Sequence, residues 1–364
     1  MTTNFSRETL CRVWLQCIDS LSWRVREAML TYFGSAEEIF DQLGGAMLAI
    51  AGEKSYASMV ELKNRGLDAL AEKLIQCDAV PVIRGQTGYP VLLNEIPDPP
   101  QLLFVRGTLS SDERSVAIVG SRRETRYGRT QAYNIAKTLA SAGVTIVSGL
   151  ARGIDTAAHE GALAAGGRTV AVLGNGIESV YPPENTQLAA RIVASGGAVI
   201  SEFPIGAEPK PYHFPVRNRI ISGMSAAILL VEGHARSGTM ITAGYAAEQG
   251  REVFALPGMV DAPSSAAPLR LLREGANICT SAQDILSDMG WEEKTTPIAQ
   301  EKPLSVKLSP SQQRIVEQLR TEPRYFEELI EATGLTVDVL TAELAMLEMD
   351  GIVESRAGRA YALN

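Results

Sequence analysis

Five short runs rich in Val and Ile, each followed by a loop rich in Gly, Ser or Arg, constrain the fold of this chain more than any other feature. Helix-like segments at 127–142, 156–165 and 239–249 alternate with these runs. The alternation predicts an α/β fold with a doubly wound, Rossmann-like parallel sheet. The five loops are Gly120-Ser121-Arg122, SGLARGID (148–155), LGNG (173–176), SEFP (201–204) and EGHARSGT (232–239).

In a sheet of this kind, ligands bind in the crevice outside the carboxyl ends of the strands. All five loops are therefore expected to converge on one crevice. Gly120 lets the backbone come close to a phosphate, Ser121 offers a hydroxyl, and the helix that begins near Tyr127 adds the positive end of its dipole. These residue types indicate a ligand that carries phosphate.

The chain of 364 residues has room for two or three domains. Residues 1–75 carry apolar residues at helical spacing, interrupted by glycines, which predicts a helical domain. The sheet domain is expected over 76–290, and the polar segment 291–307, which contains two prolines, is expected to be a linker. Residues 308–364 predict three helices and a hairpin centred on Ala357-Gly358, the pattern of a winged helix-turn-helix.

The charges of this last region argue against DNA reading by its third helix. Residues 308–364 hold five arginines against ten Asp and Glu residues, and the third predicted helix, Thr336 to Asp350, has neither Lys nor Arg. A DNA-reading helix relies on cations opposite phosphates. The pattern therefore favours a protein partner or a structural role.

The composition excludes several classes of protein. A net charge of −8 limits any nucleic-acid contact to a local patch. Four cysteines without a CxxC pair indicate reduced thiols, and the presence of only three histidines argues against a structural zinc site. The N-terminus lacks the apolar core of a signal peptide, and no stretch approaches the ~18 apolar residues that would span a membrane. We therefore expect a cytoplasmic protein without membrane contact.

Two segments supply a cationic patch. The segment SRRETRYGR (121–129) holds four arginines, including Arg122 and Arg126, and one glutamate. The segment EPKPYHFPVRNRII (208–221) interleaves cations with aromatic rings, which suits a single strand whose phosphates need cations and whose unpaired bases stack on rings. The alternative is that its ring fills the core and its arginines are ion-paired. The candidates in this second segment are Lys210, His213, Phe214, Arg217, Asn218 and Arg219.

The loop SGLARGID adds further candidates. Gly149 and Arg152 are expected at the crevice. Asp155 is expected to cap the helix that follows the loop. His159, one turn into this helix, is expected to be a buried packing residue.

Catalysis finds little support in these residues. The loops contain no G-x-G-x-x-G fingerprint, no Walker motif and no recognisable pair of nucleophile and base. The crevice is therefore interpreted as a binding site without catalytic residues, metal or cofactor. The acid and base candidates are Asp155, Glu202, Glu232 and His213.

Two alternatives stay open. Ser237, Gly238 and Thr239 form a phosphate cradle at a helix start, and this loop faintly resembles the Gly-Thr loop of nucleotide phosphoribohydrolases. A nucleotide-hydrolysing enzyme is therefore the second hypothesis, although Arg236 stands where that family has glycine. The third hypothesis is an interaction scaffold that acts through the acidic C-terminal region.

Taken in order, these loops resemble the DNA-processing protein A (Smf/DprA) family. The matching motifs span roughly residues 110–280 and include SGLARGIDTAAH, GGRTVAVLGNGIESVYPPEN, FPVRNRIISG and VEGHARSGTMITA. The resemblance implies a SAM-like or helix-hairpin-helix-like N-terminal domain and a winged-helix-like C-terminal module beside the sheet.

The resemblance also implies a function. The protein would bind single-stranded DNA, protect incoming DNA during natural transformation, load the RecA recombinase and displace single-strand-binding protein. It would act as a homodimer formed through the sheet domain. Pro183 stands where some relatives have a lysine, which makes that side of the groove less basic. The strand would pass over Ser121, Arg122, Lys210, Phe214, Arg217 and Arg219.

Overall fold

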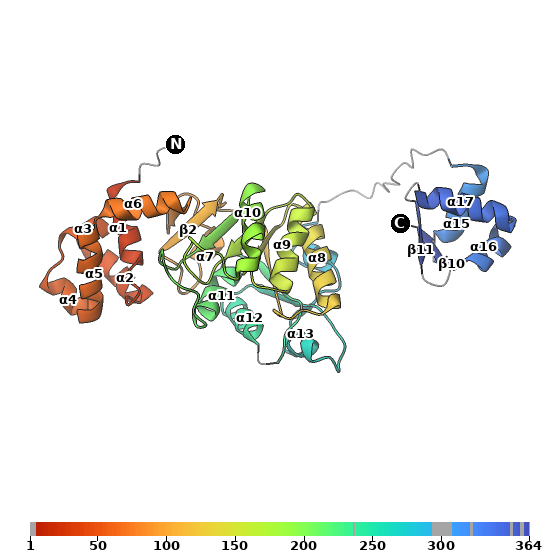
Figure 1. Cartoon of the computed structure of the whole chain (residues 1–364). Helices are drawn as coiled ribbons and strands as arrows, with labels where there is room; N and C mark the ends of the chain where they lie inside the picture. Colours follow the sequence, from red (N-terminus) through yellow and green to blue (C-terminus); the bar gives the residue numbers. More distant parts are fainter. Residues whose placement is uncertain are drawn as a thin grey trace. The chain divides into compact units, whose positions relative to one another are not determined.

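The computed structural model describes residues 5–235, 237–292, 308–320, 323–349, 352–356 and 360–363. The chain forms two compact units, Met1–Glu292 and Glu293–Asn364. The first contains six N-terminal helices and a large sheet, and the second contains a small winged helix (Figure 1). None of the helices in these ranges is long and apolar enough to cross a membrane.

The large sheet has nine strands in the order β1-β2-β6-β5-β4-β3-β7-β8-β9. The seven strands from β6 to β9 are parallel, whereas β1 and β2 are antiparallel additions at one edge. The order reverses at β3, which confirms the predicted doubly wound sheet. The strands are β1 (Val80–Ile83), β2 (Leu102–Gly107), β3 (Ser115–Val119), β4 (Thr145–Ser148), β5 (Thr169–Val172), β6 (Ala198–Ser201), β7 (Ala227–Leu230), β8 (Glu252–Ala255) and β9 (Asn277–Ile278).

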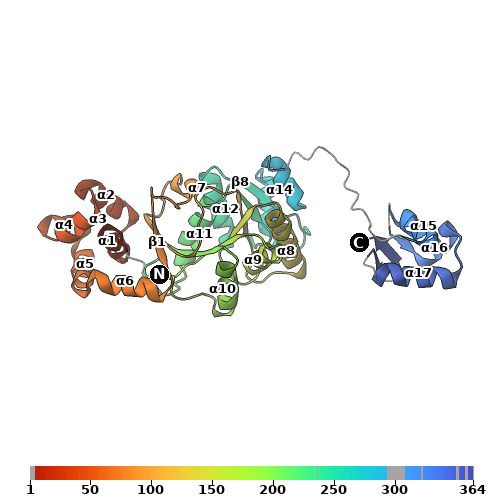
Figure 2. The same ribbon diagram turned by 90° about the horizontal axis from the view of Figure 1, so that it is seen from above.

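Helices cover both faces of the sheet, because successive side chains of each strand point to opposite faces and both faces are buried. Val116 and Ile118 of β3 pack into one core with α8 and α9, and Ala117 and Val119 pack into another with α11 and α12. Figure 2 shows the sheet with these helices from above. The helices around the sheet are α7 (Val91–Asn94), α8 (Arg126–Ser141), α9 (Ile154–Ala164), α10 (Thr186–Ala194), α11 (His213–Gly223), α12 (Gly238–Glu248), α13 (Ala266–Arg273) and α14 (Ala282–Asp288), with 3-10 turns at Pro183–Asn185 and Pro263–Ser265.

The N-terminal helices lie beside the antiparallel edge of the sheet and share a hydrophobic core with it (Figures 1 and 2). Trp14 and Phe40 belong to the same buried cluster as Phe104 of β2 and Val199 of β6. The helices are α1 (Arg7–Gln16), α2 (Trp23–Phe33), α3 (Ala36–Asp41), α4 (Gly45–Ala51), α5 (Glu53–Arg65) and α6 (Leu67–Gln76). The domain boundaries expected from the sequence, 1–75, 76–290, 291–307 and 308–364, stay predictions.

The second unit contains the three predicted helices around a small core, with Leu340 and Leu344 of the third helix fully buried or nearly so. Its strands pair in the order β10-β12-β11. The predicted hairpin centre, Ala357-Gly358, lies outside the described residues. The elements are α15 (Pro310–Leu319), β10 (Arg324–Tyr325), α16 (Phe326–Thr333), α17 (Val337–Met349), β11 (Val353–Arg356) and β12 (Ala360–Leu363).

The segment 211–219, interpreted from sequence as a loop, is helical from His213 onward in α11. Pro215 stands in the first turn of this helix, where the missing N–H has no helical partner to lose. The helix matters for the site because residues two apart in a helix do not face the same side. Arg217 and Arg219 therefore point to different surroundings.

Candidate nucleic-acid interface

A crevice of about 580 Å³ opens at the carboxyl ends of β3 and β7, where the strand order reverses. A smaller cavity beside it is lined by Gly149 and Arg152 together with Arg122 and Phe214. Arg126, Lys210, His213 and Arg219 do not line the crevice. The candidate residues that do line it are Gly120, Ser121, Arg122, Phe214, Arg217, Asn218, Ser237, Gly238 and Thr239.

Arg122 and Phe214 put a cation and an aromatic ring together in this crevice. Cζ of Arg122 lies 5.0 Å from the ring centroid of Phe214, within the range of a cation–π contact. The ring of Tyr181 lies 5.6 Å from that of Phe214, at 42°. Sequence reasoning missed Tyr181, although an aromatic residue directly before Pro182 at the end of a strand-following loop was a usable signal.

The guanidinium of Arg122 is available to a ligand. Arg122 is exposed, and neither it nor Arg123 takes part in an ion pair within the described residues. Phe214 is half-buried, and a Cβ at Gly174 would lie 2.8 Å from its ring. The ring thus packs on the LGNG loop and also lines the crevice.

Arg217 lines the same crevice but is built into its floor. It is only 3% exposed, and its Nη1 donates to the carbonyl oxygen of Gly149 at 2.7 Å and to that of Val172. Burial lowers the pKa of Arg217 to about 10, against the opposing effect of Asp155. A Cβ at Gly149 would lie 2.6 Å from Nη1, so the glycine makes room for this guanidinium. Arg217 therefore joins the ends of β4 and β5.

Asp155 does not cap α9 as expected, because the helix already begins at Ile154 and its N-cap is Gly153. The carboxylate reaches back instead, and its Oδ2 accepts from the N–H groups of Gly149 at 3.1 Å and Ala151 at 3.3 Å. Burial raises the pKa of Asp155, although Arg217 and these amides oppose the shift. Asp155 holds the preceding loop in place.

His159 is fully buried, as predicted. Its Nδ1 lies 2.7 Å from Oγ1 of Thr169. Burial lowers the pKa of His159 to about 3, so the ring is neutral at physiological pH. It packs between α9 and the sheet and does not line the crevice.

Arg219, expected on the path of the strand, does not line the crevice. It is 5% exposed, and it forms ion pairs with Glu202 (Nη2 to Oε2, 2.6 Å) and Asp98 (Nε to Oδ2, 2.8 Å). Burial opposes its charge, but the two carboxylates outweigh this and raise the pKa of Arg219. The reason for the difference is the helical geometry of α11, which turns Arg219 away from Arg217.

The start of α8, expected to hold phosphate, is already occupied by a carboxylate of the chain itself. Glu232 is 3% exposed and accepts from the N–H of Thr125 at 2.9 Å and from its hydroxyl. Thr125 is the N-cap of α8 and in turn accepts from the N–H of Gly128 at 3.1 Å. The positive end of this helix dipole is thus neutralised internally.

The other candidates differ in how freely they present their groups. Arg126 is exposed at the start of α8, and Arg152 forms an exposed ion pair with Glu184 at 2.5 Å. Ser237 is the N-cap of α12, and its hydroxyl contacts that of Thr239. No group of three or more potential metal ligands is present in the part of the chain that the structure describes.

Gly120 has a packing role that predicts its response to substitution. A Cβ at this position would lie 2.5 to 2.8 Å from the side chain of Ile154, which is fully buried. Gly120→Ala is therefore expected to destabilise the protein by about 1–3 kcal/mol, because a buried β-branched side chain cannot move aside freely. Urea unfolding measures this change.

Gly244→Ala is the matched control, because Gly244 lies within α12 and a Cβ there meets nothing within 4 Å. Alanine in a helix should stabilise by up to about 1 kcal/mol relative to glycine. If both substitutions shift stability in the same direction and by the same amount, the packing role of Gly120 is wrong.

Comparison with known proteins identifies the family. Residues 81–290 match the family described as DNA recombination-mediator protein A, and residues 299–359 match the DprA winged helix domain. Protein Smf of Escherichia coli (strain K12) is 40% identical over 278 residues, which cover 74% of each chain. DNA processing protein DprA of Bacillus subtilis (strain 168) is 41% identical over 251 residues, 68% of this chain and 82% of the relative.

Solved structures agree with this. The X-ray structure of DNA processing protein A from Streptococcus pneumoniae matches with a TM-score of 0.65 at 34% identity, over 78% of this chain and 99% of that one. A structure of DNA processing protein A from Helicobacter pylori, described for its single-stranded DNA binding mode, matches with a TM-score of 0.50 at 28% identity, over 55% and 92% of the two chains. The predicted resemblance is confirmed, and the chain belongs to the DNA recombination-mediator protein A (DprA/Smf) family.

Proposed function

We propose that this chain binds single-stranded DNA in the crevice at the carboxyl ends of β3 and β7. The observation that carries the proposal is that Arg122, which is exposed and has no ion pair within the described residues, lies over the ring of Phe214. A cation beside an accessible ring suits a strand with free phosphates and unpaired bases. The Helicobacter pylori relative, described for single-stranded DNA binding, supports the same ligand here.

The wider role that we propose is that of a recombination mediator in natural transformation. The protein would protect the incoming strand in the cytoplasm, displace single-strand-binding protein and load RecA, acting as a homodimer. Membership in the DNA recombination-mediator protein A family supports this role.

We further propose that the crevice binds its ligand without chemical change. The carboxylates that could serve as acid or base have internal partners: Glu202 pairs with Arg219, Glu232 with Thr125, and Asp155 with loop amides. A carboxylate held in this way is not poised to take a proton from a ligand. Hydrolysis of a nucleotide therefore has less support than binding.

Arg122→Ala is expected to weaken binding of a single strand about tenfold, because one phosphate contact and one cation–π partner are lost. The slope of log affinity against log salt should fall by about 0.7, the value for one contact to a single strand. Fluorescence anisotropy of a labelled strand at several salt concentrations measures both quantities.

Arg191→Ala is the control, because Arg191 is exposed on α10 and lines none of the cavities described above. It should leave the affinity and the slope unchanged. Equal binding by the Arg122 and Arg191 variants would refute the crevice as the DNA site. The same pair, added to RecA and a strand covered by single-strand-binding protein, tests the mediator role through RecA-dependent ATP hydrolysis.

A further inference from the structure

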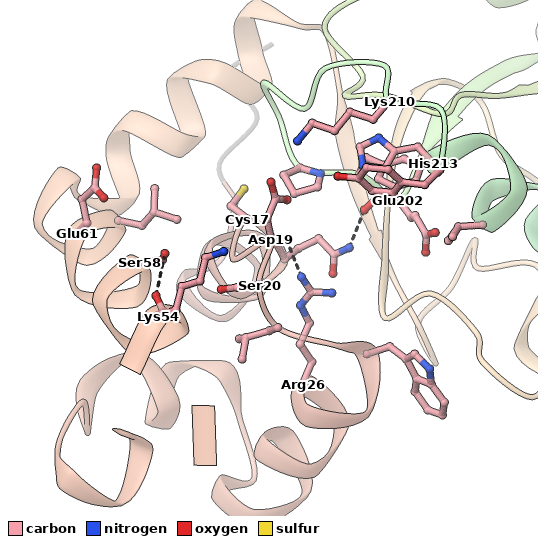
Figure 3. A pocket seen from close by; sticks show the side chains of 18 of the residues that line it. Cys17, Asp19, Ser20, Arg26, Lys54, Ser58, Glu61, Glu202, Lys210 and His213 are labelled. Carbon is pink, nitrogen blue, oxygen red and sulfur yellow. Dashed lines mark hydrogen bonds between the residues drawn. The ribbon is translucent and has the colours of Figure 1, made fainter. Parts of the chain in front are cut away.

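A second and larger cavity, of about 760 Å³, lies between the N-terminal helices and the segment that joins β6 to α11 (Figure 3). Its walls come from the α1–α2 connection, from α5 and from residues 202–219. The walls are fixed to each other, because Nε2 of Gln16 donates to the carbonyl oxygen of Glu202 at 2.6 Å in a buried position. The cavity is therefore a stable feature of the first unit.

The segment 209–214 is a wall common to this cavity and the crevice. Pro209, Pro211 and Phe214 line the crevice, whereas Lys210, Tyr212 and His213 line the second cavity. A flexible polymer that leaves the crevice across this segment arrives directly in the second cavity. The candidates Lys210 and His213, which do not reach the crevice, thus belong to the neighbouring site.

Two cations in this cavity are available to a ligand. Lys54 of α5 and Lys210 take part in no ion pair within the described residues, and Figure 3 shows them on different walls. The two arginines of the cavity are engaged elsewhere. Arg26 donates to three carbonyl oxygens at the end of α1 and just beyond it, and Arg219 holds Glu202.

Among the acidic residues that line the cavity, Asp19 forms no ion pair within the part of the chain that the structure describes. Glu61 pairs with Arg65 at 2.6 Å, and Glu202 is paired with Arg219. Asp19 is exposed and lies between the two lysines in the view of Figure 3. With Ser20 beside it, Asp19 offers acceptors for an amino group.

An aromatic platform completes the cavity. Tyr212 is 62% exposed and meets the ring of His213 edge-on, at 4.7 Å and 81°. His213 in turn stacks on Phe203, at 4.2 Å and 25°, and its Nδ1 lies 3.2 Å from the carbonyl oxygen of Gly174. The rings below Tyr212 are thus held in place, and its outer face is open to a flat ligand.

We propose that this cavity is a nucleotide subsite that receives single-stranded DNA as it leaves the crevice over the segment 209–214. Lys54 and Lys210 neutralise a phosphate, a base stacks on Tyr212, and Asp19 accepts from the exocyclic amino group that cytosine and adenine carry and thymine lacks. The proposal rests on the crevice being the main DNA site.

Lys54→Ala and Tyr212→Ala are expected to lower the affinity for a strand of about 30 nucleotides fivefold or more, as expected for loss of a phosphate contact or of one stacked base. A strand of about 6 nucleotides, which the crevice alone accommodates, should bind both variants like the unsubstituted protein. Arg122→Ala should weaken both strands. Fluorescence anisotropy with the full-length protein provides these affinities.

The matched controls are Lys137→Ala and Tyr32→Ala, since both side chains are exposed and neither lines the cavity or the crevice. Long-strand affinity equal to wild type in Lys54→Ala and Tyr212→Ala, with Arg122→Ala still impaired, would overturn the subsite and leave the proposed function standing. Failure of the unsubstituted protein to bind any strand would remove the proposed function itself.

A free nucleotide has the same chemistry as a nucleotide within a strand. Binding of dCMP tests which of the two the cavity receives. If the cavity serves a free nucleotide, dCMP binds the unsubstituted protein and not Tyr212→Ala, while the long strand binds both equally. That result overturns the subsite on the strand. Preference of the long-strand complex for dC over dT, lost in Asp19→Asn, supports the proposed contact with a base amino group.

Discussion

Glu202→Ala is expected to destabilise the first unit by about 3–5 kcal/mol, the range for a buried ion pair that loses one partner. The carboxylate is the 2.6 Å partner of Arg219, which is 5% exposed. Without it, the guanidinium keeps only Asp98, whose side chain is one-third exposed. The loss of stability is large because the buried charge of Arg219 is then left with one partly exposed partner.

Tryptophan fluorescence during urea unfolding measures this loss specifically. The three tryptophans, Trp14, Trp23 and Trp291, all belong to the first unit, so the signal does not report on the winged helix. Glu202 also anchors α1 through its backbone, because Gln16 donates to its carbonyl oxygen. This contact survives the substitution, which therefore isolates the effect of the carboxylate.

Glu184→Ala provides the comparison. Glu184 pairs with Arg152 at 2.5 Å, but both side chains are more than half exposed, so its loss should change stability by less than about 1 kcal/mol. The double variant Glu202→Leu with Arg219→Met should recover much of the stability, because the buried charge is removed with its partner. Similar losses from Glu202→Ala and Glu184→Ala would show that burial is not the cause.

The sheet and its ligand crevice were predictable because they depend on local pattern. Apolar runs such as SVAIV formed strands, and the loops after them met where the order of strands reverses. The winged helix followed from three helical segments and a hairpin in the same way. In each case neighbouring residues carry the information, and tertiary contacts agree with it.

Which arginines are exposed and which are buried could not be predicted from sequence. Arg122, Arg217 and Arg219 all look alike as cations in glycine-rich or proline-rich segments, yet only Arg122 is exposed. What separates them is distant in the chain, since Arg219 meets Glu202 and Asp98 and Arg217 meets carbonyl groups after β4 and in β5. Helix α11, which turns the two buried arginines to different sides, could not be recognised from sequence because Pro215 and a mixed polar pattern obscure its period.

Arg217→Met is the second large effect, with an expected loss of about 2–4 kcal/mol. Methionine keeps most of the aliphatic volume but leaves the carbonyl oxygens of Gly149 and Val172 without their charged donor. It also leaves Asp155 without the cation that favours its charged form. The same fluorescence-detected unfolding measures the change.

Arg122→Met in the same crevice separates a structural arginine from a ligand-binding one. Because Arg122 is exposed and unpaired within the described residues, its replacement should alter stability by no more than about 0.5 kcal/mol while weakening strand binding. Arg217→Met should show the opposite behaviour: the protein loses stability, and strand binding changes only as a consequence of that loss. Wild-type stability in Arg217→Met, combined with lost strand affinity, would assign the buried guanidinium to the DNA. In that case both Arg122 and Arg217 would bind the ligand, whereas the contacts within the fold assign this role to Arg122 alone.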